Sequence, residues 1–349
     1  MTALVRFHVS PGGYKYPPVH FGRLKPHTGP QGELSLSLTT PDELPSRTSA
    51  RMSLPPPTKN QAYCDVSAFN AGTLNMLLGQ LVDVAIGDEM TDLPVLSFVL
   101  RHSHTGDILL FDLGIRPDVE NYSAGALQLT KKMGMTLHGR DIPAALERGG
   151  VSRADVKHVA FSHIHFDHTG NPGAFPNAKF ILGHGALKIL EEQGPVFENT
   201  LYSIDVPRER TVFVNPEVGI SEPSVEEKWG PLGPFPRALD LYSDGSLYIV
   251  DAPGHIPGHI NIMARTSADG GWVYLGGDSA HDWRLLTGEA GIGCHHMWGC
   301  IHEDRASAEQ TIERLKAVAA TPRVRVLLAH DKPFVKEGKG YWPDKIASL

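Results

Sequence analysis

One ten-residue stretch of the chain carries most of the side chains that could do chemistry. Residues 161–170 read Phe-Ser-His-Ile-His-Phe-Asp-His-Thr-Gly and contain His163, His165, Asp167 and His168. Imidazole and carboxylate groups together are the ligands that zinc, iron and manganese take in proteins. An apolar run before the stretch predicts a buried strand, and the glycine after it predicts a turn. The spacing therefore predicts a metal site at a strand end, and argues against a histidine-rich surface loop.

Three later segments each place a histidine or an aspartate directly after an apolar run. Residues 253–259 read Pro-Gly-His-Ile-Pro-Gly-His and offer His255, residues 276–278 offer the carboxylate of Asp278, and residues 328–331 offer His330. A single histidine after a strand is more often a hydrogen-bonded structural residue. Four such segments in one chain instead predict a shared site, in which Asp278 could bridge two metal ions.

The elements that must position these residues alternate between strands and helices. Apolar runs at 93–100 and 108–111, separated by turn residues, predict a hairpin whose second strand ends at Asp112. A helix is predicted from residue 142, with Asp141 as its N-cap. The remaining pattern predicts strands at 156–161, 179–182, 246–250, 272–275 and 324–328 and helices at 186–192 and 306–320. This alternation favours one α/β domain over two.

Two regions depart from that pattern. Residues 1–60 hold ten of the 27 prolines and predict an extended N-terminal arm that wraps the domain or a dimer partner, with a partly disordered tail as the alternative. Residues 200–240 are rich in proline and aromatic residues and predict a long loop or lid. That loop either caps a pocket or packs on the domain through its aromatic side chains, which are Tyr202, Phe213, Trp229 and Phe235.

The composition narrows the class of protein. The chain has 349 residues and a net charge of -7, which argues against a nucleic-acid backbone as the main partner. Its three cysteines, Cys64, Cys294 and Cys300, do not describe a disulfide framework and suit a reducing compartment. We find no signal peptide and no run long enough to span a membrane, so we expect a cytoplasmic protein without a membrane partner.

Taken together, the four segments resemble the metallo-β-lactamase superfamily, with its HxHxDH signature, PGHxxGH loop, strand-end aspartate and final strand-end histidine. The resemblance covers roughly residues 66–335 and is greatest to the quorum-quenching lactonase and glyoxalase II branches. It implies an αβ/βα four-layer sandwich, with one catalytic domain at 61–349 that follows the arm at 1–60. In that fold the metals lie at the edge of the two sheets.

The resemblance also implies a ligand set for two divalent metal ions. One ion would be held by His163, His165, His255 and Asp278, and the other by Asp167, His168, His330 and the same Asp278. Asp112 resembles the family's structural aspartate, which supports a ligand from behind. Zinc is the expected metal, although the same ligands accept iron, manganese or cobalt.

The chemistry follows from the ions. A water that bridges two divalent cations is acidified to hydroxide near neutral pH, and the cations polarise the carbonyl that it attacks. Asp167 would orient this nucleophile, so that no serine or cysteine nucleophile is required. We therefore expect a hydrolase, and in particular a lactonase that opens a cyclic ester. A lactamase or a thioesterase with the same centre is the alternative.

One position departs from the lactonases that the chain resembles. Those enzymes carry a tyrosine three residues after the bridging aspartate, whereas this chain carries His281. A histidine there could donate to the oxyanion or protonate the leaving alkoxide, so we assign His281 a catalytic role beside Asp167. A purely structural role is the alternative, and the substitution leaves the exact substrate class open.

The stretch Cys294–His302 has several interpretations. It could line the substrate pocket through Met297 and Trp298, hold a third metal or be structural. His259 is expected to support His255. A nuclease would need a basic face, a sulfur dioxygenase would use one iron, and a binding protein would have lost ligands, so these functions are disfavoured. A homodimer remains possible.

Overall fold

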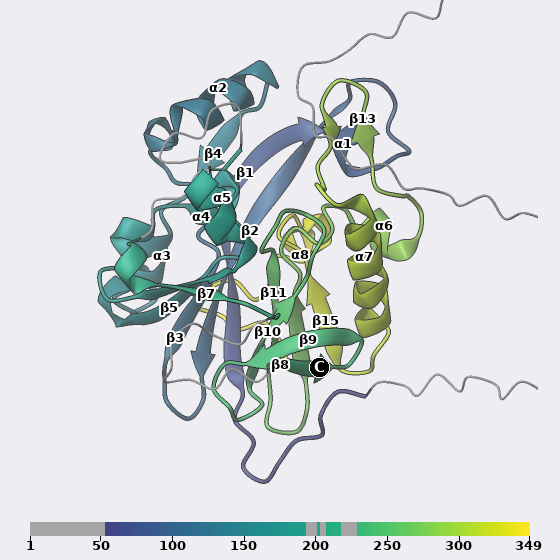
Figure 1. Cartoon of the computed structure of the whole chain (residues 1–349). Coiled ribbons are helices and arrows are strands. Elements are labelled where there is room, and N and C mark those ends of the chain that lie inside the picture. Colours follow the sequence, from purple (N-terminus) through teal and green to yellow (C-terminus); the bar gives the residue numbers. More distant parts are fainter. Residues whose placement is uncertain (1–52, 193–200, 203–206, 218–228) are drawn as a thin grey trace, which may run out of the picture. The chain divides into compact units, whose positions relative to one another are not determined.

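The strands form two large sheets, shown in Figure 1 for the residues that the computed structural model describes: 53–192, 201–202, 207–217 and 229–349. The first sheet has the order β4 (Leu137–Gly139), β1 (Cys64–Leu77), β2 (Met90–His102), β3 (Ile108–Phe111), β5 (Val156–Ala160), β6 (Lys179–Gly183), β7 (Thr211–Val214). The second has the order β15 (Val324–Leu327), β12 (Trp272–Leu275), β11 (Ile260–Arg265), β10 (Leu247–Asp251), β9 (Phe235–Asp240), β8 (Trp229–Leu232). A short hairpin, β13 (Cys294–His295) and β14 (Gly299–Cys300), stands apart from both.

Helices flank the sheets. Those that follow strands of the first sheet are α1 (Leu78–Leu81), α2 (Ala124–Lys132), α3 (Ile142–Arg148), α4 (Phe166–Thr169) and α5 (Gly185–Glu192). Three helices lie later in the chain: α6 (Trp283–Thr287) follows β12, α7 (Arg305–Ala319) follows β14 and α8 (Lys332–Glu337) follows β15. In Figure 1, α3 lies beside the first sheet and α7 beside the second.

Strand side chains alternate between two hydrophobic clusters, because successive residues of a strand point to opposite faces. In β12, Val273 and Leu275 join the cluster that both sheets share, whereas Trp272 and Tyr274 join the cluster that includes the helices. Strand β2 alternates in the same way. The result is two sheets packed face to face with helices outside them, which is the expected αβ/βα four-layer sandwich.

Most of the predicted elements are present with small shifts at their ends. The predicted hairpin is the antiparallel pair β2–β3, in which Phe98 lies opposite Phe111. Helix α3 begins after Asp141, whose side chain accepts a hydrogen bond of 2.9 Å from the backbone N–H of Ala144. The long C-terminal helix, α7, begins one residue earlier than predicted, after the cap residue Asp304.

The prediction of a single long loop over residues 200–240 was wrong. The described residues there include β7, β8 and β9, and residues 203–206 and 218–228 lie outside the description. Strands β7 and β8 are at sheet edges, where a proline such as Pro231 costs no ladder hydrogen bond. The proline content of this segment therefore suggested a loop where the chain forms edge strands. Phe235 is buried and stacks on Tyr274, with ring centroids 4.8 Å apart, and therefore belongs to the core.

The predicted N-terminal arm lies almost entirely outside the described residues, which begin at residue 53. Its described end, residues 53–58, is irregular and is held by Arg265, whose guanidinium donates to the carbonyls of Pro55 at 2.7 Å and Pro56 at 3.1 Å. None of the helices in the described ranges is long and apolar enough to cross a membrane.

Candidate metal centre

Both sheets deliver polar side chains to one edge of the sandwich. In the first sheet, Asp112 follows β3, and the histidine-rich stretch follows the adjacent parallel strand β5 and continues into α4. In the second sheet, His255, Asp278 and His330 follow β10, β12 and β15 in that order. The sequence places these residues as much as 167 positions apart, and the fold brings all seven predicted ligands together in a buried cluster.

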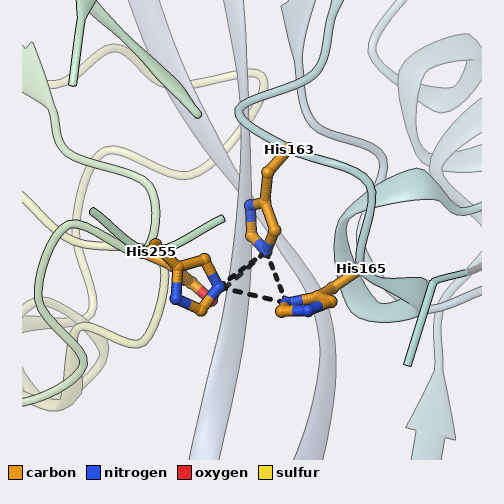
Figure 2. Close-up of side chains that lie close together, drawn as sticks. His163, His165 and His255 are labelled. Atoms are coloured by element: carbon orange, nitrogen blue, oxygen red, sulfur yellow. Dashed lines mark hydrogen bonds and ion pairs between the residues drawn. The ribbon is translucent and has the colours of Figure 1, made fainter. Parts of the chain in front are cut away.

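Three imidazoles of this cluster point at a common centre (Figure 2). The Nε2 atom of His163 lies 2.9 Å from Nδ1 of His165, and Nε2 of His255 lies 3.1 Å and 3.0 Å from those two atoms. Oδ2 of Asp278 lies 3.6 Å from the His163 nitrogen and 3.4 Å from the His255 nitrogen. Ligands at zinc bond lengths of about 2.0–2.1 Å would stand about 3.3–3.4 Å apart in a tetrahedron, so these four atoms fit one ion.

A second set of atoms surrounds the other oxygen of Asp278. Oδ1 of Asp278 lies 3.3 Å from Nε2 of His168 and 3.4 Å from Nε2 of His330. Oδ2 of Asp167 lies 3.7 Å and 3.6 Å from the same two nitrogens. The carboxylate of Asp278 thus faces both sets, one oxygen to each.

Unpaired polar atoms supply an independent test of whether a metal fits. Nε2 of His168 and Oδ1 of Asp278 are buried and make no hydrogen bond to any described residue, although they lie 3.3 Å apart. Buried polar atoms without partners are rare in native proteins, because each one costs free energy. A divalent cation between them would satisfy both, so the donor set fits the ions that the sequence predicts.

Contacts behind the cluster fix how three of these rings are turned. Nδ1 of His163 lies 3.0 Å from Oγ of Ser162, Nδ1 of His168 lies 2.8 Å from Oδ2 of Asp112, and Nδ1 of His330 lies 2.8 Å from the carbonyl oxygen of Pro94. Such contacts commonly orient metal-binding imidazoles. The carbonyl of Pro94 can only accept, so Nδ1 of His330 carries the proton and Nε2 is left as a ligand.

The electrostatics separate the histidines into two kinds. Burial lowers the pKa of His163 and of His255 well below the usual value and lowers the pKa of His165 to about 4. Burial also acts to lower the pKa of His168, but the nearby carboxylates, Asp278 foremost, outweigh it and raise that pKa. The three imidazoles of the first set are therefore neutral and have free lone pairs, which is the form that binds a cation.

A narrow cavity opens onto the cluster. Its polar wall is made of His165, Asp167, Asp278, His281 and His330. Its apolar wall is made of Leu74, Met76, Met135, Phe166, Leu201 and Ile301. The structure therefore places His281 at the cavity, with its Nε2 atom 3.0 Å from Oδ2 of Asp278 but out of line for a hydrogen bond.

The four aromatic residues of the 200–240 segment divide between the two roles considered for them, capping the pocket and packing on the domain. Tyr202 stacks on His165, with ring centroids 5.5 Å apart and planes 14° from parallel, and its hydroxyl donates to Glu303. Phe213 packs against the helix-side cluster and Trp229 against the cluster between the sheets, so neither belongs to the cavity wall. Of the four, only Tyr202 is next to the metal centre.

Two further expectations need correction. The hairpin β13–β14 leaves Met297 exposed and places the ring of Trp298 against Nζ of Lys132, so Ile301 is the residue of this segment that lines the cavity. His259 does not support His255. Its Nε2 atom accepts from the backbone N–H of Asp278 at 3.1 Å, so it supports the shared carboxylate's loop instead.

Sequence analysis missed Ser162 and Glu303 as parts of the site, and it singled out the stretch that ends at His302 without giving that residue a role. Ser162 lies inside the histidine-rich stretch, but only the fold shows that its hydroxyl contacts both His163 and Asp112. His302 packs against His255 and His281, with ring centroids 5.3 Å and 5.2 Å away. No spacing signal marks it, because its neighbours lie on other segments.

Comparison with known proteins agrees with the fold described above. The sequence profile described as the metallo-beta-lactamase superfamily matches residues 90–330. A protein named metallo-hydrolase mfmC, from Annulohypoxylon moriforme, is 33% identical over 66% of this chain and 62% of its own length. A protein named gamma-lactamase MBL2, from Gibberella moniliformis, is 34% identical over 50% of this chain and 70% of its own length.

A solved structure supports the fold. A variant of B. thuringiensis AiiA with N-decanoyl-L-homoserine bound at its active site superposes with a TM-score of 0.61, at 19% identity, over 82% of this chain and 100% of that one. Among curated relatives, the chain spans 62% of the Annulohypoxylon protein and 36% of another from Penicillium brevicompactum.

Proposed function

Since this chain belongs to the metallo-beta-lactamase superfamily, we propose that it is a metal-dependent hydrolase with two divalent ions, and that its substrate is a cyclic ester. One observation carries the proposal: the two oxygens of Asp278 face two separate sets of ligand atoms. The residues that would hold the ions are His163, His165, His255 and Asp278 for the first and Asp167, His168, His330 and Asp278 for the second. Zinc is the metal that we propose, since tetrahedral nitrogen and oxygen sites suit it.

Bound ions would supply an acidified water and an electrophile that polarises the substrate carbonyl. The protein's own contribution is positioning. Asp167 lines the cavity, so its carboxylate can accept a hydrogen bond from the attacking water and fix its direction. The contacts from Asp112, Ser162 and Pro94 hold the histidines still, so little reorganisation is needed during the reaction.

His281 is the second group that we propose as catalytic. It lies at the cavity wall, it is 1% exposed, and neither of its ring nitrogens has a hydrogen-bond partner among the described residues. An imidazole at that place can donate to the carbonyl oxygen as negative charge develops on it. It can also give a proton to the alkoxide that leaves when the ring opens.

The chemistry of the cavity's lining favours an apolar acyl compound as the substrate. Six of its wall residues are apolar, and a neutral carbonyl compound needs no cationic clamp. Solved relatives in this fold include N-acyl homoserine lactone hydrolases, one with the product N-hexanoyl-L-homoserine at its metal centre. The relatives named gamma-lactamases favour a second candidate, in which the same centre opens a lactam.

The first experiment is a hydrolysis panel with zinc- or manganese-loaded protein. Acid release at constant pH reports the opening of lactones and thioesters, and chromatography of the product reports the opening of lactams. The panel holds short and long acyl-homoserine lactones, an aromatic lactone, a β-lactam, a γ-lactam and a glutathione thioester. Turnover of lactones that stops on chelation and returns with metal supports the lactonase. Turnover of only the γ-lactam would replace it with the lactamase, and turnover of only the thioester would replace it with a thioesterase.

Two wider proposals accompany this function. We take residues 61–349 as the catalytic domain and residues 1–60 as an arm. Cys64, Cys294 and Cys300 are all free thiols in the structure, which is the state expected in a cytoplasmic protein.

A further inference from the structure

Three buried imidazoles stand together on the side of the centre that faces α7. The ring centroids of His255, His281 and His302 are 5.0, 5.2 and 5.3 Å apart, and each ring is tilted by 59° or more against the next. The three side chains are 2% exposed or less. Only His255 belongs to the ligand set described above. The burial of the other two rings beside it therefore needs a separate explanation.

The ring nitrogens of this triangle are short of partners. Nδ1 of His255 and both nitrogens of His281 and of His302 make no hydrogen bond among the described residues. Each buried, unpaired nitrogen costs free energy, and five of them in one place are far from the native norm. Since none of these nitrogens hydrogen-bonds to another, a single water enclosed between the rings would satisfy several of them at once.

His255 differs in this respect from three of the other histidine ligands. Nδ1 of His163, His168 and His330 each has a partner outside the ligand set, at 3.0 Å or less. A metal-bound imidazole almost always donates its other ring N–H to such a partner, which fixes the ring and makes it a better ligand. Within the described residues, His281 and His302 are the side chains beside His255 whose nitrogens lack a partner. His281 faces Asp278 and the cavity, so we assign this contact to His302.

The backbone holds His302 in register with His255. The N–H of Glu303 donates to the carbonyl of His255 at 2.8 Å, and the N–H of Asp304 donates to the carbonyl of Gly254 at 3.0 Å. Oγ1 of Thr311, on α7, donates to the carbonyl of Pro253 at 2.7 Å. The 253–255 loop, residues 302–304 and the start of α7 therefore form one rigid unit.

We propose that His302 is a positioning residue that accepts the ring N–H of His255 and donates to His281 through one enclosed water. A neutral imidazole has one donor and one acceptor, which is what a place between those two rings requires. His302 would thereby turn His255 toward the first ion and hold His281 at the cavity wall. The inference rests on the metal centre proposed above.

The test compares two substitutions of similar size. His302→Leu fills the space without any hydrogen-bonding group, whereas His302→Gln keeps one donor and one acceptor. A matched control is His158→Gln, which changes a partly buried histidine of β5 whose Nδ1 is also unpaired. Each protein is titrated with a competing chelator, and the visible absorption spectrum of its cobalt-loaded form is recorded.

We expect His302→Leu to hold one of two ions about 10- to 100-fold more weakly and to alter the cobalt spectrum, because a lost supporting contact has that effect. His302→Gln should recover most of the affinity, and His158→Gln should match the wild type. If the leucine variant does not fold, His302→Ala replaces it.

Three results would overturn the inference. Equal ion affinity and equal cobalt spectra in the leucine variant and the wild type would remove His302 from the centre while leaving the centre itself intact. A third ion in the wild type that is lost in both variants would make the triangle a metal site of its own. A wild type that binds no divalent ion would overturn both this inference and the proposed function.

Discussion

Oδ2 of Asp112 lies 2.8 Å from Nδ1 of His168, and both side chains are almost wholly buried. Asp112 has a φ of 61°, a left-handed backbone conformation that is uncommon outside glycine, asparagine and aspartate. Its other oxygen accepts from the backbone N–H of Ser162 at 2.7 Å. Burial raises the pKa of Asp112, yet the contacts with His168 and Ser162 act in the other direction. The fold accepts an uncommon backbone conformation at the place where this carboxylate supports a ligand.

Asp112→Asn should weaken the second ion by about 10- to 100-fold, the usual range for a lost supporting contact. Asparagine tolerates the left-handed conformation, so the backbone should stay in place and the loss should reflect the charge. Metal affinity, measured by chelator competition, checks this. An affinity equal to that of the wild type would show that Asp112 does not support His168.

Asp278→Ala should lower the metal content to one ion or none per chain, because both ligand sets lose an oxygen atom. Elemental analysis after dialysis gives the count directly. Asp92→Ala, which changes an exposed carboxylate of β2, is the control and should keep the wild-type content. Two firmly held ions in the Asp278 variant would remove this residue from the bridge.

His281→Ala should keep both ions and slow turnover by about 10²-fold or more, since a positioned acid–base group commonly contributes that much. The loss should appear in kcat more than in KM, because the group acts as the ring opens. Replacing the exposed His296 by alanine should leave both constants unchanged. A variant of His281 with wild-type rates would give the residue a structural role only.

Removing the metal should destabilise the protein. Ions that bind only the folded chain, at about 1,000 times their dissociation constant, stabilise it by about 4 kcal/mol. For a domain of this size, with an unfolding entropy of about 0.6 kcal/mol/K, that corresponds to a fall in Tm of roughly 6–7 °C on chelation. Thermal unfolding with and without chelator measures it, and the Asp278→Ala variant should respond much less. A Tm that chelation leaves unchanged in the wild type would contradict metal binding to the native state.

Gly254→Ala should destabilise the protein and disturb the first ion together. Gly254 has a φ of 131°, and a Cβ atom there would stand 2.2 Å from the backbone nitrogen of Ala308 on α7. Neither atom can move without shifting the loop that carries His255. A fall in Tm with a parallel loss of metal affinity is expected, whereas Gly230→Ala, where a Cβ meets nothing, should change neither.

The ligands of the centre could be predicted because they are encoded locally. His163, His165, Asp167 and His168 lie within six positions, and each later ligand follows an apolar run that becomes a strand. The choice of Asp278 as the shared residue depended on a family resemblance. Its two oxygens lie 3.3–3.6 Å from ring nitrogens of histidines that follow strands of both sheets. Such distances cannot be predicted from the spacing of residues in the sequence.

The rest depended on packing between distant segments. His302 and His255 are in contact although they lie 47 positions apart in the sequence. Backbone hydrogen bonds bring their segments together, and amino-acid composition does not predict such bonds. Edge strands such as β8 tolerate proline and short length, so residues 229–240 resembled a loop. His259 was assigned to the wrong neighbour, because proximity in sequence to His255 says nothing of which group its ring meets.

The order of the ligands along the chain has a consequence for how the protein matures. The first set is complete once Asp278 has been synthesised, but the second waits for His330, which follows β15 near the C-terminus. Strand β15 also pairs in parallel with β12, the strand that carries Asp278 to its place. A nascent chain that has not yet reached His330 therefore cannot present both sites, and full metal loading must follow the synthesis and pairing of β15.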